Sequence, residues 1–252
     1  MKRFLFAFFL VLAFPYMAWG GHSDLKIMTE DYPPYNYQHE GQIRGLAVDI
    51  LLRMFEITGE ELHLEDIELL PWKRAYRDVL NESGTMLFGM TRTPEREDLF
   101  KWVGPITDVT IGLLALKGSD IEVDSLDDIK PYRVGVVASD VGEMMLLAQG
   151  VDVENMEQSP TPWSNILKLK HGRVDLFAYD LRVAFFVANY LGMPDGIFKP
   201  VYSLGHSQIY YAFHRDTEDQ VIQKFQNALD ELKRNDESGR SEYDRILAKY
   251  LH

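Results

Sequence analysis

The stretch Thr85-Met86-Leu87-Phe88-Gly89-Met90 is a short apolar run, which predicts a buried β-strand. Toward the N-terminus, residues 72–80 are amphipathic with a helical period, and Leu62-His63-Leu64 is a candidate for a short strand. Farther upstream, apolar residues recur with a helical period over Leu46–Thr58, and residues 25–28 predict a first strand. The order strand, helix, strand, helix, strand favours an α/β layer with a largely parallel sheet.

A second unit begins after Pro105 and repeats this alternation. Its predicted strands cover 111–116, 132–137 and 174–178, and its predicted helices cover 125–129, 142–149, 164–171 and 181–191. The C-terminus adds a predicted strand over 208–213 and predicted helices over 218–234 and 242–250. No Gly/Ser-rich linker separates the two units, which favours two lobes joined by extended hinge segments.

The acidic composition excludes some partners. The 252 residues contain 39 Asp and Glu against 26 Lys and Arg, which gives a formal net charge of -13. Because such a surface repels phosphates and anionic lipids, we expect no nucleic-acid partner and no binding to an anionic membrane surface. The charge of a small ligand stays open, because a binding site can differ in sign from the whole surface.

The N-terminus has the pattern of a secretory signal peptide. Lys2 and Arg3 precede an apolar run over residues 4–14, and Ala18-Trp19-Gly20 offers small residues at a cleavage site. The alternative is a membrane anchor, but the run is short for a spanning helix. The sequence has no cysteine, so we expect no disulfide and no lipid-modified cysteine. We therefore expect a mature protein that is free in the periplasm.

The segment Gly89-Met90-Thr91-Arg92-Thr93-Pro94-Glu95-Arg96 resembles the motif of the family 3 solute-binding proteins, the polar amino acid-binding subunits of ABC importers. The resemblance implies that Arg96 holds the carboxylate of a ligand and that Thr91 supplies a hydroxyl. Gly89 stands where the family often has serine, which weakens the contact expected at that position. Arg92 stands where the family commonly has an apolar residue, so we assign it no ligand contact.

Further segments match the same family in the same order. Residues 29–35 place Tyr32 at the aromatic position that stacks over the ligand. Residues 172–180 resemble a G-x-x-D run with Asp180 where the family receives the ligand's ammonium. Residues 45–50 and 239–247 resemble the start of the first helix and the final glycine-to-helix segment. The resemblance covers essentially the whole mature chain.

The resemblance implies an α/β fold of the two-lobed, type II periplasmic binding protein class, in which each lobe is a mixed sheet flanked by helices. We expect the signal peptide over residues 1–20, one lobe over 21–108 with 208–252, and the other lobe over 109–207.

One segment departs from the family pattern. Ser139-Asp140-Val141 stands where the family often has Gly-Thr or Gly-Ser, and Asp140 would repel a ligand carboxylate. The segment Pro71-Trp72-Lys73-Arg74-Ala75 resembles a subgroup of the family whose ligand the sequence does not identify. The candidate ligand-binding residues are Arg96, Asp180, Tyr32, Thr91, Trp72, Gly89, Ser139, Asp140 and Glu30.

An arginine and an aspartate suit an α-amino acid, because a guanidinium grips a carboxylate with two parallel hydrogen bonds and a carboxylate receives an ammonium. Tyr32, Tyr35 and Trp72 are candidates for the apolar walls. Simpler roles stay open at each position. Arg96 is then a surface residue paired with a neighbouring glutamate, Asp180 a helix N-cap, and the aromatics part of the core.

These features predict a small-molecule binder that captures an amino acid or related zwitterion for import through an ABC permease in the inner membrane. We expect a monomer with no cofactor and no catalytic residues. The seven histidines show no metal-ligand spacing, so we expect no metal. One alternative is an enzyme similar to cyclohexadienyl dehydratases, with Glu30, Asp31 or Glu143 as the acid. The other is a ligand-sensing partner of a membrane receptor.

Overall fold

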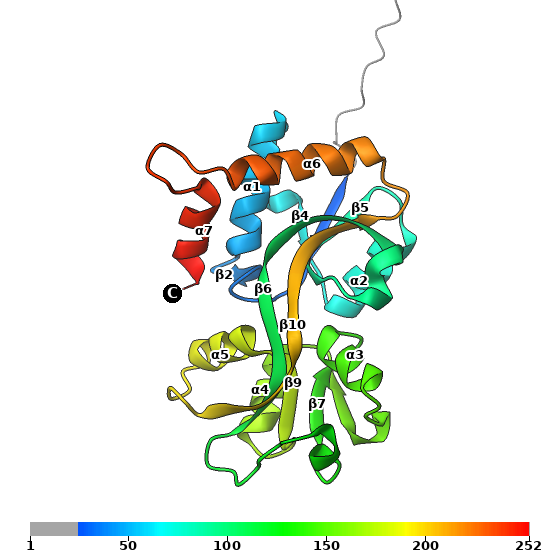
Figure 1. The fold of residues 1–252 in the computed structure, drawn as a ribbon, viewed down its shortest axis with the longest axis vertical. Coiled ribbons are helices and arrows are strands. Elements are labelled where there is room, and N and C mark those ends of the chain that lie inside the picture. Colours follow the sequence, from blue (N-terminus) through cyan, green and yellow to red (C-terminus); the bar gives the residue numbers. More distant parts are fainter. Residues whose placement is uncertain (1–24, 252) are drawn as a thin grey trace, which may run out of the picture.

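Two long antiparallel strands, β6 (Phe100–Leu116) and β10 (Phe198–His214), run through both lobes of the molecule (Figure 1). The structure is a computed structural model that describes residues 25–251. The eight-stranded sheet has the order β4-β1-β5-β10-β6-β9-β7-β8. The end of β10 pairs with β5 in one lobe, and the end of β6 pairs with β9 in the other. The two-lobed α/β fold expected from the sequence is therefore confirmed.

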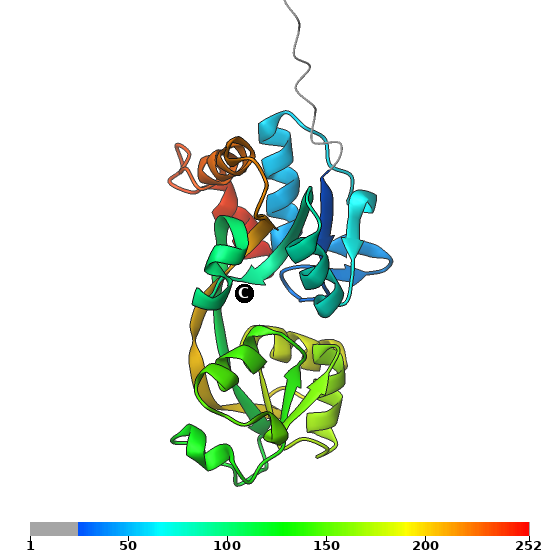
Figure 2. The same cartoon turned by 90° about the vertical axis from the view of Figure 1, so that its right-hand side faces the viewer.

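The first lobe is a sheet with helices on both faces. Its elements are β1 (Lys26–Thr29), β2 (Tyr37–His39), β3 (Gln42–Arg44), α1 (Leu46–Thr58), β4 (Ile67–Leu69), α2 (Trp72–Asn81), β5 (Thr85–Thr91), α6 (Asp219–Leu232) and α7 (Glu242–Tyr250). Strand residues alternate between faces: Met28 and Leu87 pack with α2, while Ile27 and Phe88 belong to the core that holds α1 and α6. Figure 2 shows the sheet and the helices of this lobe from the side.

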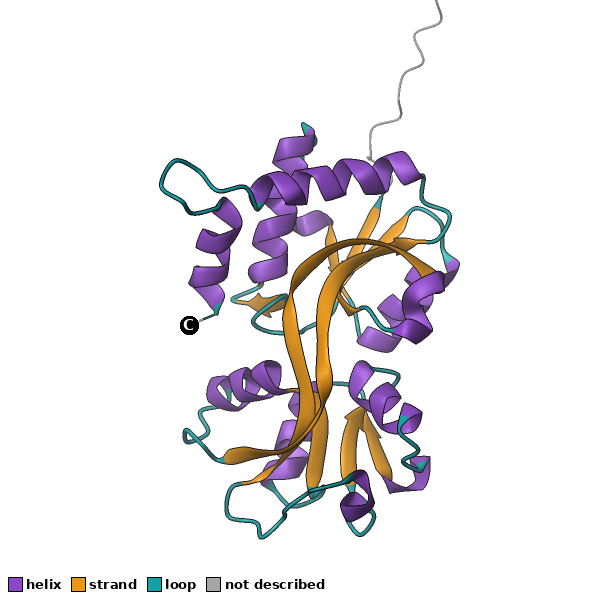
Figure 3. Cartoon of the chain, in the orientation of Figure 1, coloured by secondary structure: helices purple, strands orange, loops and turns teal. Residues whose placement is uncertain are grey.

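The second lobe places three helices around a short parallel sheet (Figure 3). Its elements are β7 (Val134–Val137), α3 (Val141–Ala148), β8 (Met156–Ser159), α4 (Pro162–Lys170), β9 (Leu176–Asp180) and α5 (Leu181–Tyr190). All residues of β7 and β9 are buried, which agrees with the continuous apolar runs of their sequences. Among residues 25–251, no helix is both long and apolar enough to cross a membrane.

One predicted strand is wrong, and several segments were not predicted. Leu62-His63-Leu64 leads into a 3-10 turn, because the carboxylate of Asp66 accepts a hydrogen bond from the backbone N–H of His63 at 3.2 Å. The strand forms only afterwards, as β4, where Ile67 is the buried residue. Strands β2, β3 and β8, and the first parts of β6 and β10, were not predicted either. The predicted signal peptide lies outside the described residues.

Gly45 sets the start of α1 against the turn that carries Tyr32 and Tyr35. Its φ is 136°, and a Cβ there would lie 2.3 Å from the carbonyl oxygen of Tyr35. That same carbonyl accepts a hydrogen bond from Ala47 N at 2.8 Å, so the turn and the helix are tied together. Any side chain at position 45 would separate them.

We predict that Gly45→Ala lowers the free energy of unfolding by about 2–4 kcal/mol, because it adds a backbone clash to a strained φ. Gly59→Ala is the matched control: its φ is 76°, but nothing lies within 4 Å of the added Cβ. The control should lose only about 1 kcal/mol. Urea unfolding of both variants measures the difference, and equal losses would contradict the close approach at Gly45.

Candidate functional site

The candidate residues gather because they follow the carboxyl ends of parallel strands that face one another across the lobes. Glu30 follows β1, and Arg96 lies in a 3-10 turn, Pro94–Leu99, after β5. Asp140 follows β7, and Asp180 is the last residue of β9. In open α/β sheets this edge is where ligands bind.

These side chains are ionisable and almost completely buried. Arg96 and Asp180 are 0% exposed, and Asp140 and Glu30 are 5% and 6% exposed. Burying a charge costs free energy unless the charge is paired or hydrogen-bonded. A group of buried ionisable side chains at the meeting point of two lobes is therefore typical of a functional site.

Arg96 lies between aromatic rings. Its guanidinium carbon is 5.0 Å from the ring centre of Trp72 and 5.2 Å from that of Tyr76. Nη1 donates to the carbonyl of Thr91 at 3.1 Å, and Nη2 donates to the carbonyl of Ser139 at 3.3 Å. Nε has no hydrogen-bond partner among the described residues. The alternative of a surface arginine is wrong, and the guanidinium keeps donor capacity for a further acceptor.

Ser139 connects the lobes through its backbone. Its carbonyl accepts a second hydrogen bond, from the indole Nε1 of Trp72 at 2.9 Å. Its φ is 63°, a left-handed conformation, and its N–H donates to Glu143 Oε2 at 2.6 Å. Trp72 is 2% exposed, and its ring packs against the guanidinium of Arg96. It therefore supports Arg96 and does not form an open apolar wall of the ligand site.

Asp180 uses both carboxylate oxygens. Oδ1 accepts from the backbone N–H groups of Arg182 at 2.7 Å and Val183 at 3.0 Å, which caps α5. Oδ2 accepts from the hydroxyls of Tyr32 at 3.2 Å and Tyr35 at 3.4 Å, which belong to the other lobe. The N-cap role considered for Asp180 is confirmed, and the same side chain also joins the lobes. Burial raises the pKa of Asp180 to about 6, against the opposing effect of these hydrogen bonds.

Asp140 and Glu30 are less well paired. Asp140 stands at the N-cap of α3 without a side-chain capping bond, and its Oδ2 has no hydrogen-bond partner among the described residues. Burial raises the pKa of Asp140 to about 6, although the positive charge of Arg96 opposes this. Burial also raises the pKa of Glu30 well above its usual range, and the charges of Asp140 and Asp31 add to the effect.

Gly89 and Thr91 act mainly through the backbone of β5. Gly89 has a φ of 81°, and a Cβ there would lie 2.5 Å from Oδ1 of Asn36. Asn36 therefore fills the space that a serine side chain at position 89 would need. Thr91 is 3% exposed and gives its carbonyl to Arg96.

The structure adds residues that the sequence analysis did not assign. Tyr179 is fully buried, and its hydroxyl has no hydrogen-bond partner among residues 25–251. Trp163 donates from Nε1 to Asp31 Oδ2 at 3.0 Å, and Nη1 of Arg182 donates to the Tyr35 hydroxyl at 3.2 Å. The signal available for Tyr179 was its place directly before Asp180 in the matched run.

A second contact between the lobes is aromatic. The ring of Tyr37, in the β2–β3 hairpin, is 5.3 Å from that of Phe186 in α5. The ring centre of His39 lies 6.2 Å from that of Tyr190. The ring centre of Tyr190 lies 5.4 Å from that of Trp163. This aromatic contact adds to the hydrogen bonds that hold the lobes in the closed arrangement.

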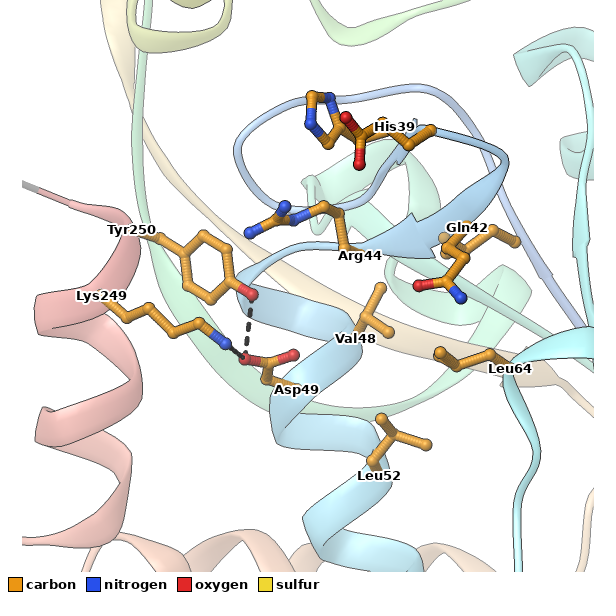
Figure 4. A pocket seen from close by; sticks show the side chains of 11 residues that line it. His39, Gln42, Arg44, Val48, Asp49, Leu52, Leu64, Lys249 and Tyr250 are labelled. Carbon is orange, nitrogen blue, oxygen red and sulfur yellow. Dashed lines mark hydrogen bonds and ion pairs between the residues drawn. The ribbon is translucent and has the colours of Figure 1, made fainter.

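Surface pockets lie elsewhere, among them two with the following linings. One, of about 380 Å³, is formed by the hairpin, α1 and α7 (Figure 4). In it, Asp49 Oδ2 accepts from Lys249 Nζ at 2.6 Å and from the Tyr250 hydroxyl at 2.9 Å. The other, of about 520 Å³, borders β10 near Tyr210. None of the nine candidate residues lines either pocket. Within the described part of the chain, no three His, Cys, Asp or Glu side chains form a group that could hold a metal ion.

Comparison with known proteins gives a family, relatives and structural neighbours. The model of the bacterial extracellular solute-binding proteins, family 3, matches residues 25–252. The L-cystine-binding protein TcyJ of Escherichia coli K12 is 26% identical over 153 residues, which cover 59% of this chain and 55% of TcyJ. The match thus spans about half the length of that relative. The arginine-binding extracellular protein ArtP of Bacillus subtilis is 25% identical over 217 residues, covering 83% of this chain and 80% of ArtP.

Solved structures share the fold. A histidine kinase sensor domain with similarity to periplasmic binding proteins aligns with a TM-score of 0.77 and 20% identity, covering 90% of this chain and 96% of that domain. An ancestral arginine-binding protein bound to arginine aligns with a TM-score of 0.74 and 23% identity, covering 90% of this chain and 98% of that protein.

We predict that the ligand-free protein is more stable near pH 5 than near pH 7.5. The pKa values of Asp140 and Asp180 are both raised to about 6 in the folded state. Folding therefore favours their protonated forms, and the stability this contributes is lost as the pH rises through about 6. Urea unfolding should give a decrease of about 1–3 kcal/mol between the two pH values. Asp140→Asn should flatten this dependence, whereas a wild-type stability that rises over the same range would contradict the prediction.

Proposed function

The chain belongs to the family 3 bacterial extracellular solute-binding proteins, and on this premise we propose that it captures an amino acid or a related zwitterion between its lobes. The observation that carries the proposal is the placement of Arg96 and Asp180. Both are fully buried, they come from opposite lobes, and Arg96 Nε has no hydrogen-bond partner among the described residues. The ligand's carboxylate would accept from Arg96, and its ammonium would lie against Asp180.

Closure of the lobes strengthens both contacts, because excluding water lowers the local dielectric constant. It also makes each charge costly if it is left unpaired, so a ligand lacking either group is rejected. The Tyr32 hydroxyl, which donates to Asp180, would orient that carboxylate toward the ammonium. Relatives named for binding cystine and arginine support an amino acid as the ligand class.

The cellular context follows from the family and the predicted signal peptide. The protein acts in the periplasm as a monomer and delivers its ligand to an ABC permease of the inner membrane. One lobe comprises residues 21–108 with 208–252, and the other comprises 109–207. Support for this division comes from the strand pairing: Ile209 pairs with Thr91 in one lobe, and Ile111 pairs with Asp180 in the other.

A second candidate function is supported by Glu30. Burial raises the pKa of the Glu30 carboxyl well above its usual range, which favours the protonated form that a general acid needs. An enzyme similar to cyclohexadienyl dehydratases would use it to protonate the departing hydroxyl of prephenate or arogenate, so that water and carbon dioxide leave together and the ring becomes aromatic. Turnover of either compound by the wild type, and its loss in Glu30→Gln, would favour this function over simple binding.

We consider any amino acid that raises the melting temperature of the wild type. We predict that Arg96→Ala lowers the affinity for it at least about 30-fold, because the buried carboxylate of the ligand loses its partner. The twenty L-amino acids are first tested by thermal shift, since a ligand that binds the folded state raises its melting temperature. Calorimetric titration then gives the affinities.

Arg92→Ala is the matched control. Arg92 lies four residues away in the same segment, but it pairs with Glu97 at the surface and packs on Trp102 and Tyr210. Its loss should leave the affinity within about twofold, because exposed ion pairs contribute little. Unchanged affinity in Arg96→Ala would refute the carboxylate contact, and the absence of any stabilising amino acid would refute the proposed ligand class.

A further inference from the structure

The carbonyl of Ser139 joins the two lobes through two donors. Ser139 belongs to the lobe that carries α3, and its carbonyl accepts from the indole Nε1 of Trp72 at 2.9 Å and from Nη2 of Arg96 at 3.3 Å. Both donors belong to the other lobe, and both side chains are buried. Because hydrogen bonds are stronger away from water, this carbonyl is a point at which the protein itself holds its lobes together.

The nitrogen of Arg96 that makes this contact is the one that a carboxylate needs most. A guanidinium can grip a carboxylate along two edges, Nε with Nη2 or Nη1 with Nη2, and Nη2 belongs to both. Nη2 has two hydrogens and two acceptors from the opposite lobe, the Ser139 carbonyl and the sulfur of Met144 in α3 at 3.1 Å. Neither edge is therefore free to grip a carboxylate while the Ser139 turn is in place.

Glu143, in α3, holds the Ser139 turn. Its Oε2 accepts from the backbone N–H of Ser139 at 2.6 Å, and its Oε1 accepts from Nε2 of Gln158 at 2.5 Å. The φ of Ser139 is 63°, a left-handed conformation that is unfavourable for a residue with a Cβ. The charge-assisted hydrogen bond from its N–H to Glu143 stabilises this conformation, in which the carbonyl reaches Arg96 and Trp72.

We propose that the Ser139 turn is a latch between the lobes that competes with a carboxylate for Nη2 of Arg96, and that Glu143 is the positioning residue that holds this latch. A carboxylate then receives both donors of one guanidinium edge only when the Ser139 carbonyl leaves Nη2. The latch rests on contacts within the protein. The competition rests on the proposed function, because it assumes that Arg96 receives the carboxylate of the ligand.

The latch lowers the affinity for a carboxylate ligand. The binding-competent molecules are those in which the turn has left Nη2, and the apparent dissociation constant rises as their fraction falls. Weakening the latch therefore raises the affinity, whereas the loss of a residue that contacts the ligand, or damage to the fold, lowers it. This difference in sign distinguishes a positioning role of Glu143 from a structural one.

The latch is tested first without a ligand, by the distance between the lobes. The sequence has no cysteine, so spin labels attach only to the exposed sites Ser83→Cys, after α2, and Gln149→Cys, at the end of α3. Double electron–electron resonance on the full mature protein should give one short distance. Glu143→Ala should add longer distances, and so should Trp72→Phe, which keeps a ring beside Arg96 but loses the indole donor. Glu143→Gln should keep the wild-type distribution.

The competition is tested by calorimetric titration with each of the twenty L-amino acids. For every one that binds the wild type, Glu143→Ala should bind it at least about fivefold more tightly than Glu143→Gln, because the binding-competent fraction rises. Glu143→Gln is the matched control. Both variants lose the same charge, but the amide keeps an oxygen that accepts from the N–H of Ser139.

The outcomes separate the latch from the proposed function. Long distances in the wild type, or the wild-type distribution in Glu143→Ala and Trp72→Phe, would overturn the latch. Affinity in Glu143→Ala that is equal to or lower than in Glu143→Gln would overturn the competition while the amino acid binder stands. If no amino acid binds, the competition and the proposed function fail together, and the distances still decide on the latch. Trp72→Phe acts on the same carbonyl from the other lobe, so a Glu143→Ala protein that does not fold leaves that test intact.

Discussion

The structure depends on the burial of one guanidinium and several carboxylates where two lobes meet. Taking such groups out of water is expensive, and hydrogen bonds within the protein satisfy only part of their needs. Asp180 is satisfied by two backbone N–H groups and two tyrosine hydroxyls, whereas Asp140 Oδ2, Arg96 Nε and the Tyr179 hydroxyl have no partner among the described residues. A ligand with complementary charges supplies the missing contacts, and this makes closure selective.

The fold accounts for this arrangement. In each lobe the parallel strands end at the same edge, so the residues that follow β1, β5, β7 and β9 converge without being close in sequence. Strands β6 and β10 run through the parts of the sheet that lie in both lobes and hold these edges opposite each other (Figure 2). Contacts across the lobes include directional hydrogen bonds, such as the Trp72 indole to the Ser139 carbonyl and the Tyr32 hydroxyl to Asp180. They define one closed geometry, in which Arg96 Nε and Asp140 Oδ2 keep no hydrogen-bond partner among the described residues.

Helices and central strands could be predicted from the sequence, whereas the crossing strands could not. The helix over Leu46–Thr58 has the predicted bounds. Its apolar period indicates the buried face, and Gly59 indicates where the helix ends. In β6, which passes from one lobe to the other, the buried residues Phe100, Val103, Ile106 and Val109 recur every third position. That spacing hides a strand, whose usual period is two. At the site, the motif indicated Arg96 and Asp180. The pairing of Trp72 with Ser139 and the burial of Tyr179 depend on how the lobes meet, which no local pattern encodes.

The central claim is that the ligand's positive charge compensates buried carboxylates, and proton release on binding tests it most directly. Calorimetric titration near pH 6 with an amino acid that raises the melting temperature, in two buffers of different ionisation enthalpy, gives the number of protons exchanged. Asp140 and Asp180 have pKa values raised to about 6, so a cation placed beside them lowers these values and expels protons. The account predicts net proton release near pH 6 that diminishes near pH 8. Binding without proton release near pH 6, or with proton uptake, would contradict it.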